Sequence, residues 1–459
     1  MAKKTVPGAT LLYPLPAVLV SCGQGEDANL ITIGWTGIIN SDPPRTYISV
    51  RPSRHSHDII EKEGEFVINL TTQDLVFGGH NIIAEYGSIL AECRNFETSV
   101  VTADIDISRL RAERRKMTTF PGKTPEAENT YTKVSFSLSQ EDVRLERSYD
   151  PAPFVPSDPS KRTRRCEEIF SIQAYGLKKR YEHIGSKTAV LGLSGGLDST
   201  LALLVTVRAF DLLGLDRKGI LCVTMPCFGT TDRTKNNSYL LAEALGTGLR
   251  EVDIRASVLQ HFEDIGQSTE VQDVTYENGQ ARERTQVLMD IANKEGGIVI
   301  GTGDLSELAL GWATYNGDHM SMYAVNAGVP KTLVRHLVRY VADTCQKEEL
   351  RNVLLDVLDT PVSPELLPPK EGEISQRTED LVGPYELHDF FLYYMLRYGY
   401  SPKKIYLLAK LAFLNSYDDS TIKKWLVIFM KRFFAQQFKR SCLPDGPKVG
   451  TVALSPRGD

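Results

Sequence analysis

A glycine-rich turn at residues 194–199 constrains the fold of this chain more than any other feature of its sequence. The turn follows an apolar, strand-like run at 188–193 and precedes a helix-like segment at 200–213. A strand that feeds a turn and then a helix leaves backbone N–H groups without intrahelical partners at the helix N-terminus, where an anion can bind. The sequence therefore predicts an α/β unit with an anion site at this turn.

The side chains of the turn favour the phosphate chain of a nucleotide. The six residues are Ser194, Gly195, Gly196, Leu197, Asp198 and Ser199. The two glycines let phosphate oxygens approach the main chain, the serines add hydroxyl donors, and the aspartate is an oxygen ligand suited to the Mg²⁺ that accompanies ATP. The chain contains no Gly-x-x-x-x-Gly-Lys-Ser/Thr string, so the turn is not a Walker P-loop. The alternative is a chance Gly-Gly turn with a serine cap, which the flanking strand and helix disfavour.

A second turn with acidic side chains follows a later apolar run at 297–300. It spans residues 301–307, Gly-Thr-Gly-Asp-Leu-Ser-Glu. The carboxyl ends of parallel strands meet at one sheet edge, so Asp198 and Glu307 are expected to hold one Mg²⁺ across the ATP phosphates. Two alternatives remain. The turn could be a dinucleotide fingerprint, which fails at Ser306 where a third glycine is required, or Glu307 could be an idle acid at a helix N-terminus.

The order of elements predicts an α/β fold with a doubly wound parallel sheet. From residue 166 onward helical stretches alternate with apolar strands at 189–193, 219–225, 249–254 and 298–301, and residues 385–440 form a helical C-terminal part. The chain instead begins with short strand-like runs at 17–21, 30–34, 46–50 and 66–70. A proline-rich connector lies between these two regions.

Composition excludes several classes of protein. With 459 residues, of which 42% are hydrophobic, the chain can form two or three domains, and its net charge of −5 argues against nucleic-acid or membrane-surface binding. The one basic cluster, at residues 161–165, is interpreted as a solvated linker. Seven cysteines without Cys-x-x-Cys spacing, and no apolar leader or bilayer-length run, predict a cytoplasmic protein.

Four blocks in order resemble the NAD synthetases, a family of ATP pyrophosphatases of the adenine nucleotide alpha-hydrolase type. The blocks are the two turns, residues 276–284 and residues 329–332. Residues 383–391 and 437–448 further resemble the glutamine-dependent branch of that family.

The resemblance implies that deamido-NAD is amidated to NAD through an adenylate, with release of AMP and pyrophosphate. It implies Mg²⁺ on Asp198 and Glu307, a dimer through the synthetase domain and no side-chain nucleophile. ATP or pyrophosphate would contact the first turn, Thr302 and Lys331, and the dinucleotide would contact Arg282, Trp312 and Lys439. Without the resemblance, Arg282 and Lys331 would be ordinary cations on a helix surface.

The nitrogen source is where the sequence departs from this family. Residues 73–120 resemble the tail of a nitrilase-type amidase domain, but the Glu, Lys and Cys triad of such a domain has no match in this sequence. Ammonia is therefore expected as the direct donor, with glutamine used only through an external amidase. Cys166 lies in a nucleophile-like string, but helical sequence follows it and no strand precedes it, so it is interpreted as structural. Cys93 is interpreted as a packing residue.

The first 72 residues resemble the opening half of a flavin-reductase-like split barrel that binds FMN. The resemblance would place near the flavin Trp35, Thr36, Asn40, Ser41 and Arg51. The predicted organisation is thus a split-barrel fragment at 1–72, an amidase remnant at 73–120, a connector at 121–165 and a synthetase domain at 166–459. Alternatives to the ligase remain open: FMN-dependent flavin reductase activity, an inactive chimera, or a non-catalytic binding or oligomerising subunit in which the amidase remnant is only an interface.

Overall fold

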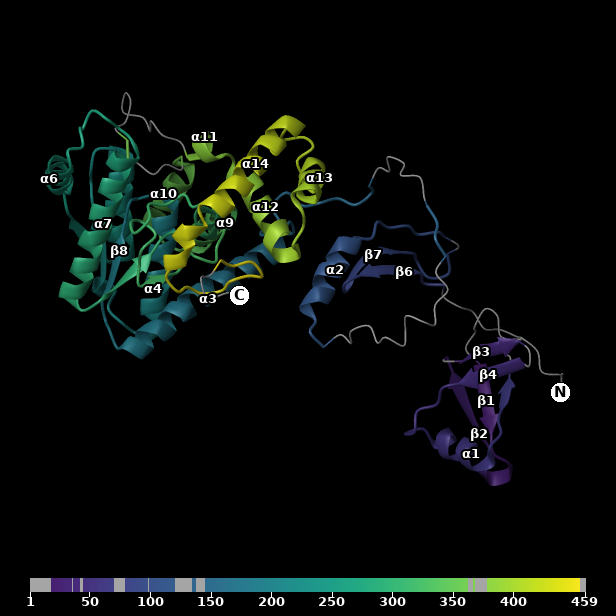
Figure 1. Ribbon diagram of the computed structural model, residues 1–459. Helices are drawn as coiled ribbons and strands as arrows, with labels where there is room; N and C mark the ends of the chain where they lie inside the picture. The colour runs from purple at the N-terminus through teal and green to yellow at the C-terminus, as the bar shows by residue number, and fades with distance from the viewer. Residues whose placement is uncertain are drawn as a thin grey trace. The chain divides into compact units, whose positions relative to one another are not determined.

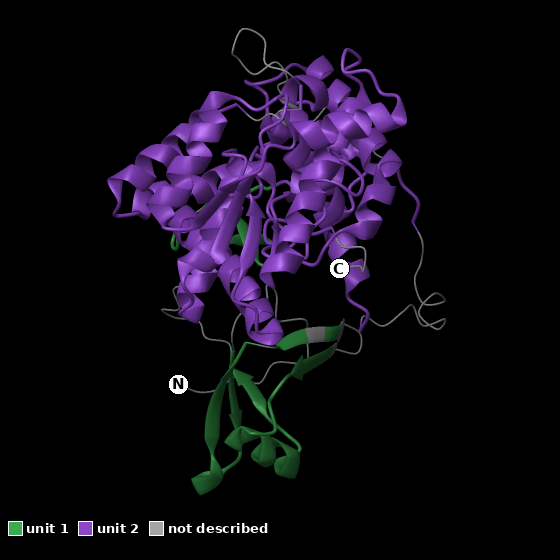
Figure 2. Ribbon diagram, turned by 90° about the vertical axis from the view of Figure 1, so that its left-hand side faces the viewer, with its two compact units in different colours: residues 1–103 green, residues 104–459 purple. Residues whose placement is uncertain are grey.

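The computed structural model describes residues 18–34, 36–41, 44–69, 79–97, 99–119, 134–137, 145–361, 366–367 and 378–454. The chain divides into two compact units, residues 1–103 and 104–459, coloured separately in Figure 2. None of the helices in the described ranges combines the length and apolar character that a membrane span requires.

Among its described residues, unit 1 consists of small antiparallel sheets, one α-helix and one short 3₁₀ turn (Figure 1). A three-stranded sheet has the order β2-β1-β5, and β3 pairs with β4 and β6 with β7 in two-stranded ribbons. The elements are β1 (Val18–Cys22), β2 (Asn29–Ile33), β3 (Thr36–Ser41), β4 (Pro44–Ile48), α1 (His55–Glu63), β5 (Val67–Asn69), β6 (Ile82–Glu85) and β7 (Ser88–Glu92), with a 3₁₀ turn at Gly25–Asp27.

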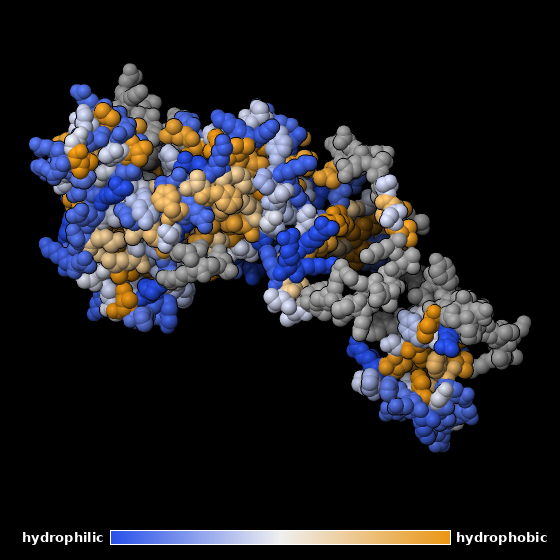
Figure 3. Space-filling view, in the orientation of Figure 1, coloured by the Kyte–Doolittle hydropathy of each residue, from blue (hydrophilic) through white to orange (hydrophobic). Residues whose placement is uncertain are grey.

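The core of unit 1 is small. Val18, Val20 and Ile33 form its buried centre, whereas Leu30, Tyr47 and Val67 are 58%, 45% and 52% exposed. Figure 3 shows hydrophobic residues at the surface of this unit. The four strands predicted in this region are confirmed within one or two residues, and the sequence missed β3 and the β6–β7 hairpin.

Unit 2 is built on a five-stranded parallel sheet with the order β10-β9-β8-β11-β12. The chain forms β8 first and then adds strands on both sides of it, which is the doubly wound arrangement that the sequence predicted. The strands are β8 (Ala189–Gly192), β9 (Ile220–Thr224), β10 (Gly248–Glu251), β11 (Ile298–Gly301) and β12 (Tyr323–Ala324). Only the short β12 was missed.

Helices cover both faces of this sheet, because successive strand residues point to opposite sides. Ala189 and Leu191 of β8 pack in one core cluster, and Val190 between them packs in another. The first face is covered by α3 (Pro159–Ile184), α4 (Leu197–Leu213), α5 (Asp232–Leu245), α9 (Lys331–Thr344) and α10 (Glu348–Asp359). The second is covered by α6 (Arg255–Ile265) and α7 (Val274–Glu295).

A separate aromatic-rich core joins α8, which spans Leu305–Leu310, to the helical C-terminal part. Phe390, Phe391 and Phe429 are fully buried there. The helices of this part are α11 (Thr378–Val382), α12 (Tyr385–Tyr398), α13 (Pro402–Ala412) and α14 (Asp419–Ala435), followed by the 3₁₀ helix η4 (Gln437–Cys442). The predicted helical C-terminal part is therefore confirmed.

Unit 2 begins well before the sheet. Its first helix, α2 (Ile107–Lys116), is capped by Asp106, which also accepts hydrogen bonds from Tyr400 (2.5 Å) and Lys404. Arg397 pairs with the buried Glu113 at 3.3 Å. One interpretation requires correction: residues 161–165, taken as a linker, form part of α3, because Asp158 caps that helix and proline stands in its first turn.

Candidate functional site

Three helices of unit 2 begin beside one another, each following a strand or turn at the same sheet edge. Asp198 is the second residue of α4, Glu307 the third of α8, and Lys331 the first of α9. The ammonium of Lys331 lies 2.6 Å from Asp198, 2.9 Å from Glu307 and 2.5 Å from Asp304. The structure thus brings together the two predicted metal ligands and the predicted ATP-contacting lysine.

Local capping fixes the start of α8. Asp304 is fully buried, and its Oδ1 accepts hydrogen bonds from the backbone N–H groups of Ser306 (2.7 Å) and Glu307 (2.9 Å). An aspartate at the N-cap satisfies helix donors that have no partner within the helix. Because its Oδ2 faces Lys331, the same carboxylate orients Glu307 and binds the lysine.

A buried amide joins the two turns. Asn326 is 0% exposed, and its Nδ2 donates to the carbonyl oxygens of Asp198 (3.0 Å) and Thr302 (3.1 Å). Gln173 of α3 donates in turn to Asn326 Oδ1 at 3.1 Å. These bonds hold the first turn and the second turn at a fixed separation.

The charged groups of the cluster shift one another's pKa values. Burial disfavours the ammonium of Lys331, but Asp198, Asp304 and Glu307 together raise its pKa well above the ordinary value. Burial, reinforced by Glu307 and Asp198, holds the pKa of Asp304 well above its usual range against the opposing effect of Lys331. Burial and the neighbouring Asp198 raise the pKa of Glu307 to about 7. The lysine is therefore charged at neutral pH, and the three carboxylates repel one another.

The donor set of this cluster fits a hard divalent cation. The three carboxylates offer ligand atoms that lie within 4.8 Å of one another. Three carboxylates against one ammonium leave up to two negative charges uncompensated, and Oδ1 of Asp198 is buried without a hydrogen-bond partner among the described residues. Such oxygens are the ligands that Mg²⁺ prefers.

A cavity of about 270 Å³ opens beside the cluster. Its lining includes Ser194, Gly196, Leu197, Asp198, Ser199, Thr302 and Glu307. The hydroxyls of Ser194 and Ser199 lie 3.1 Å apart, and Ser194 Oγ accepts a bond from the N–H of Gly196 at 3.2 Å. Most of the predicted phosphate-contacting residues therefore surround one space.

Gly195 and Gly196 have different structural roles. Its φ is +78°, and a Cβ there would lie 2.0 Å from the carbonyl oxygen of Thr234 in α5. A Cβ at Gly196 would meet only the hydroxyl of Ser194, at 3.3 Å. Gly195 thus allows the turn to pack against α5, and Gly196 lines the cavity.

The three predicted dinucleotide contacts gather around the loop at residues 311–318. Trp312 lies in this loop and is half-buried. Lys439 of η4 donates to the carbonyl oxygens of Gly311 (2.9 Å) and Ala313 (2.7 Å) on either side of it. The exposed Arg282 of α7 donates to the carbonyl of Tyr315 at 3.3 Å. Ala313 and Asp318 also line the cavity, so the loop extends from the cavity to these side chains.

The two cysteines singled out in the sequence are packed. Cys166 is 2% exposed within α3, and burial raises the pKa of its thiol. Cys93 is 7% exposed, with its sulfur 3.2 Å from the carbonyl of Gly79 and 3.0 Å from the N–H of Asn81. Both environments agree with a structural role.

Of the predicted FMN contacts in unit 1, the structure describes the side chains of Thr36 and Arg51. Thr36 is buried and donates to the carbonyl of Tyr47 at 2.8 Å, and Arg51 is exposed. Asn40 and Ser41 belong to β3, but their side chains, like all of Trp35, lie outside the described residues.

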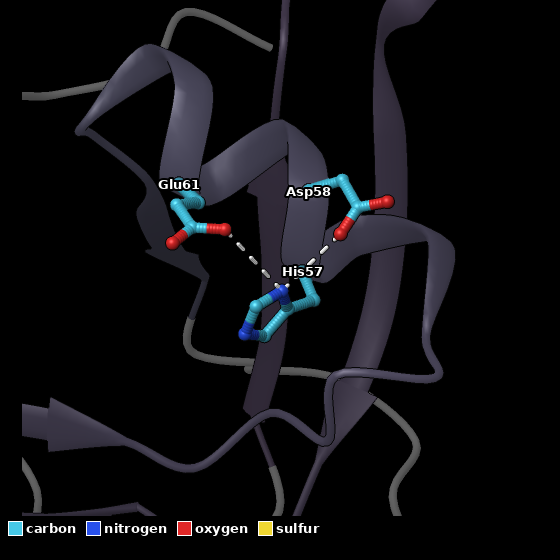
Figure 4. Close-up of side chains that lie close together, drawn as sticks. All are labelled: His57, Asp58 and Glu61. Carbon is cyan, nitrogen blue, oxygen red and sulfur yellow. Dashed lines mark hydrogen bonds and ion pairs between the residues drawn. The ribbon is translucent and has the colours of Figure 1, made fainter.

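A second acidic cluster occurs on α1. His57 lies 3.3 Å from Asp58 and 3.9 Å from Glu61 (Figure 4). Both carboxylates are well exposed. This is an ordinary pairing along a helix surface, since residues four apart are neighbours there.

Four residues of the site were not predicted from the sequence: Asp304, Asn326, Tyr385 and Asp389. Asp304 could have been predicted as a helix N-cap, because an aspartate three residues before Glu307 at a strand-to-helix turn is typical of that position. Asn326, Tyr385 and Asp389 reach the site only through the tertiary fold.

Comparison with known proteins gives two family matches. A family model described as NAD synthase matches residues 169–407, and one described as flavin reductase like domain matches residues 10–85. The glutamine-dependent NAD(+) synthetase of Mycobacterium bovis is 41% identical over 489 aligned positions, covering 100% of this chain and 69% of the relative. That of Thermotoga maritima is 30% identical and covers 83% of this chain and 61% of the relative.

A solved structure agrees with the fold. The glutamine-dependent NAD(+) synthetase of Cytophaga hutchinsonii has a TM-score of 0.51 at 20% identity, covering 64% of this chain and 53% of that one. The similarity supports the same α/β architecture in unit 2.

Proposed function

This chain belongs to the NAD synthase family of carbon–nitrogen ligases, and we propose that it amidates deamido-NAD to NAD at the expense of ATP. The observation that carries the proposal is the buried Lys331 among Asp198, Asp304 and Glu307 at three helix N-termini beside a cavity. Helix N-termini and a lysine stabilise phosphate charge, and the carboxylates supply ligands for Mg²⁺.

In the first step the nicotinate carboxylate oxygen attacks the α-phosphorus of ATP. The new P–O bond forms as the bond to the β-phosphate oxygen breaks, which yields the adenylate and pyrophosphate. The N–H groups at the start of α4 and the hydroxyls of Ser194 and Ser199 bind the departing pyrophosphate. Lys331 neutralises the negative charge that builds up as this bond breaks.

Asp198 and Glu307 would hold Mg²⁺, which supplies further charge neutralisation on the phosphate oxygens. A phosphate of bound ATP would replace part of the contact that Lys331 makes with these two carboxylates. The buried Asp304 keeps the lysine at the site throughout, because its own position is fixed by the α8 cap.

In the second step ammonia attacks the carbonyl carbon of the adenylate. The C–N bond forms, the bond to the AMP oxygen breaks, and the nitrogen loses a proton to give the amide. Trp312, Lys439 and Arg282 position the dinucleotide around the 311–318 loop. We propose ammonia as the donor in this chain because its sequence has no match to the Glu, Lys and Cys triad of a nitrilase-type amidase. The two cysteines singled out in the sequence, Cys166 and Cys93, are buried as packing residues.

The test is NAD formation by the purified protein with magnesium-ATP and deamido-NAD, with ammonium or glutamine in parallel reactions. Activity with ammonium alone supports the proposal. Activity with glutamine contradicts the proposed donor, and no activity with either favours the inactive chimera. Sedimentation of the same sample tests the accompanying proposal of a dimer through the synthetase domain.

A second candidate function belongs to unit 1. The flavin reductase like match over residues 10–85 favours FMN binding by this part of the chain. Purified protein that retains FMN absorbance, or that reduces FMN with a nicotinamide donor, would support it. Colourless protein that fails to quench FMN fluorescence would contradict it.

A further inference from the structure

The N-terminal part of α12 lies next to the cluster of Lys331 and its three carboxylates, although it comes much later in the sequence. Tyr385 and Asp389 are four residues apart on α12 and so share one face of the helix. The ammonium of Lys331 lies 5.3 Å from the centre of the Tyr385 ring. Asp389 is 1% exposed, so its carboxylate is shielded from water and depends on protein partners.

Both carboxylate oxygens of Asp389 accept hydrogen bonds from the two helices that carry Glu307 and Lys331. Its Oδ2 accepts hydrogen bonds from the N–H (3.0 Å) and the hydroxyl (2.7 Å) of Thr332 in α9. Its Oδ1 accepts a bond from the hydroxyl of Ser306 in α8. One buried carboxylate therefore joins the starts of α8 and α9.

The same bonds complete the N-terminus of α9. Its N-cap is Pro330, which offers no side-chain acceptor. The N–H of Lys331 donates instead to Ser306 Oγ at 2.9 Å, and the N–H of Thr332 to Asp389. The backbone of Lys331 is thus fixed through Ser306 by Asp389, and its ammonium faces the Tyr385 ring on one side and three carboxylates on another.

We propose that Asp389 is a positioning residue for ATP: it holds the starts of α8 and α9 together so that Lys331 is presented to the phosphates, with the Tyr385 ring limiting where the ammonium can move. The inference rests on the proposed function, since it requires ATP to bind at Lys331. A buried carboxylate with several donors is rigid, and shifts near 1 Å in a charged group strongly weaken such sites.

The test is a double-mutant cycle on magnesium-ATP affinity, measured by calorimetry on the full chain without deamido-NAD. Asp389→Asn leaves the Ser306 hydroxyl without its acceptor, and we expect ATP to bind about 10-fold more weakly, as for one charge-assisted hydrogen bond. In a Lys331→Met background the same substitution should change the affinity less than about 2-fold. The energies of residues that act through one another do not add.

The same fold-change in both backgrounds, or no change in either, would overturn the inference. Unchanged affinity in Lys331→Met alone would instead refute the ATP site of the proposed function. If Asp389→Asn does not fold, Ser306→Ala replaces it, because it removes only the group between Asp389 and the Lys331 backbone. Phe413→Leu, which alters the same helical core away from the site, is the control and should lower the melting temperature without changing the affinity.

Discussion

Lys331 shows how residue-scale chemistry depends on neighbours that the sequence keeps far apart. A lysine at the start of a helix is usually exposed, yet this one is 2% exposed and bound to three carboxylates. A buried cation is stable only with such partners. Each acidic partner is therefore expected to contribute to the site in a measurable way.

Replacing Asp198 with alanine should lower turnover by at least about 100-fold, because it removes one ligand of the cation and one partner of Lys331. Steady-state NAD formation with saturating ammonium measures this. Wild-type turnover in the folded variant would contradict the metal assignment. The third carboxylate, Asp304, should be less tolerant of change, since it also caps α8.

His388 is expected to make the stability of unit 2 depend on pH. It is 1% exposed, and burial lowers the pKa of its imidazole to about 4. The unfolded chain takes up this proton near pH 6.5 and the folded chain only near pH 4, so the free energy of unfolding should fall as the pH drops through this window, by up to about 3 kcal/mol.

Urea unfolding between pH 7 and 5 measures this effect. The His388→Gln variant cannot titrate there, so its stability should vary less with pH than that of the wild type. The matched control is His183→Gln, an exposed histidine in α3 of the same unit, which should retain the wild-type slope. An unchanged slope in His388→Gln would show that other groups carry the dependence.

At the scale of elements, the two adjacent glycines of the first turn should respond differently to alanine. Gly195→Ala forces a left-handed backbone and a clash with Thr234, so we expect a loss of at least about 2 kcal/mol in stability. Gly196 has φ −85°, which alanine also adopts, and a new Cβ would contact only the hydroxyl of Ser194. The stability of the Gly196→Ala variant should therefore change by less than about 1 kcal/mol. Thermal unfolding of both variants decides this, and equal losses would contradict the packing role of Gly195.

At the scale of the whole molecule, the second unit begins at Asp104 and includes α2, which contacts the C-terminal helices through Asp106 and Glu113. A chain that starts at residue 104 should therefore keep the main thermal transition and the ammonium-dependent activity. A chain that starts at residue 145 lacks α2 and should melt several degrees lower. Equal melting temperatures would show that α2 contributes no stability.

The sequence by itself determined four of the five strands of the parallel sheet, the two turns beside its cavity and seven of the residues that line that cavity. It could do so because a short apolar run, a Gly-Gly turn and a helix are local patterns set by backbone sterics and hydrogen bonding. Asp198, Thr302 and Glu307 all lie in the turns, or at the helix starts, that follow β8 and β11, so the rule that parallel strands end at one edge was enough to group them.

Only the tertiary structure decided which side chains fix the positions of Asp198, Thr302 and Glu307. Tyr385, Asp389 and Asn326 follow no local pattern, and they meet Lys331 and the two turns because separate cores bring α8, α9 and α12 together. The linker assigned to 161–165 is helical for a related reason, since its cap and its packed face lie outside the basic run itself. Long-range packing decides such contacts, and a single sequence does not display it.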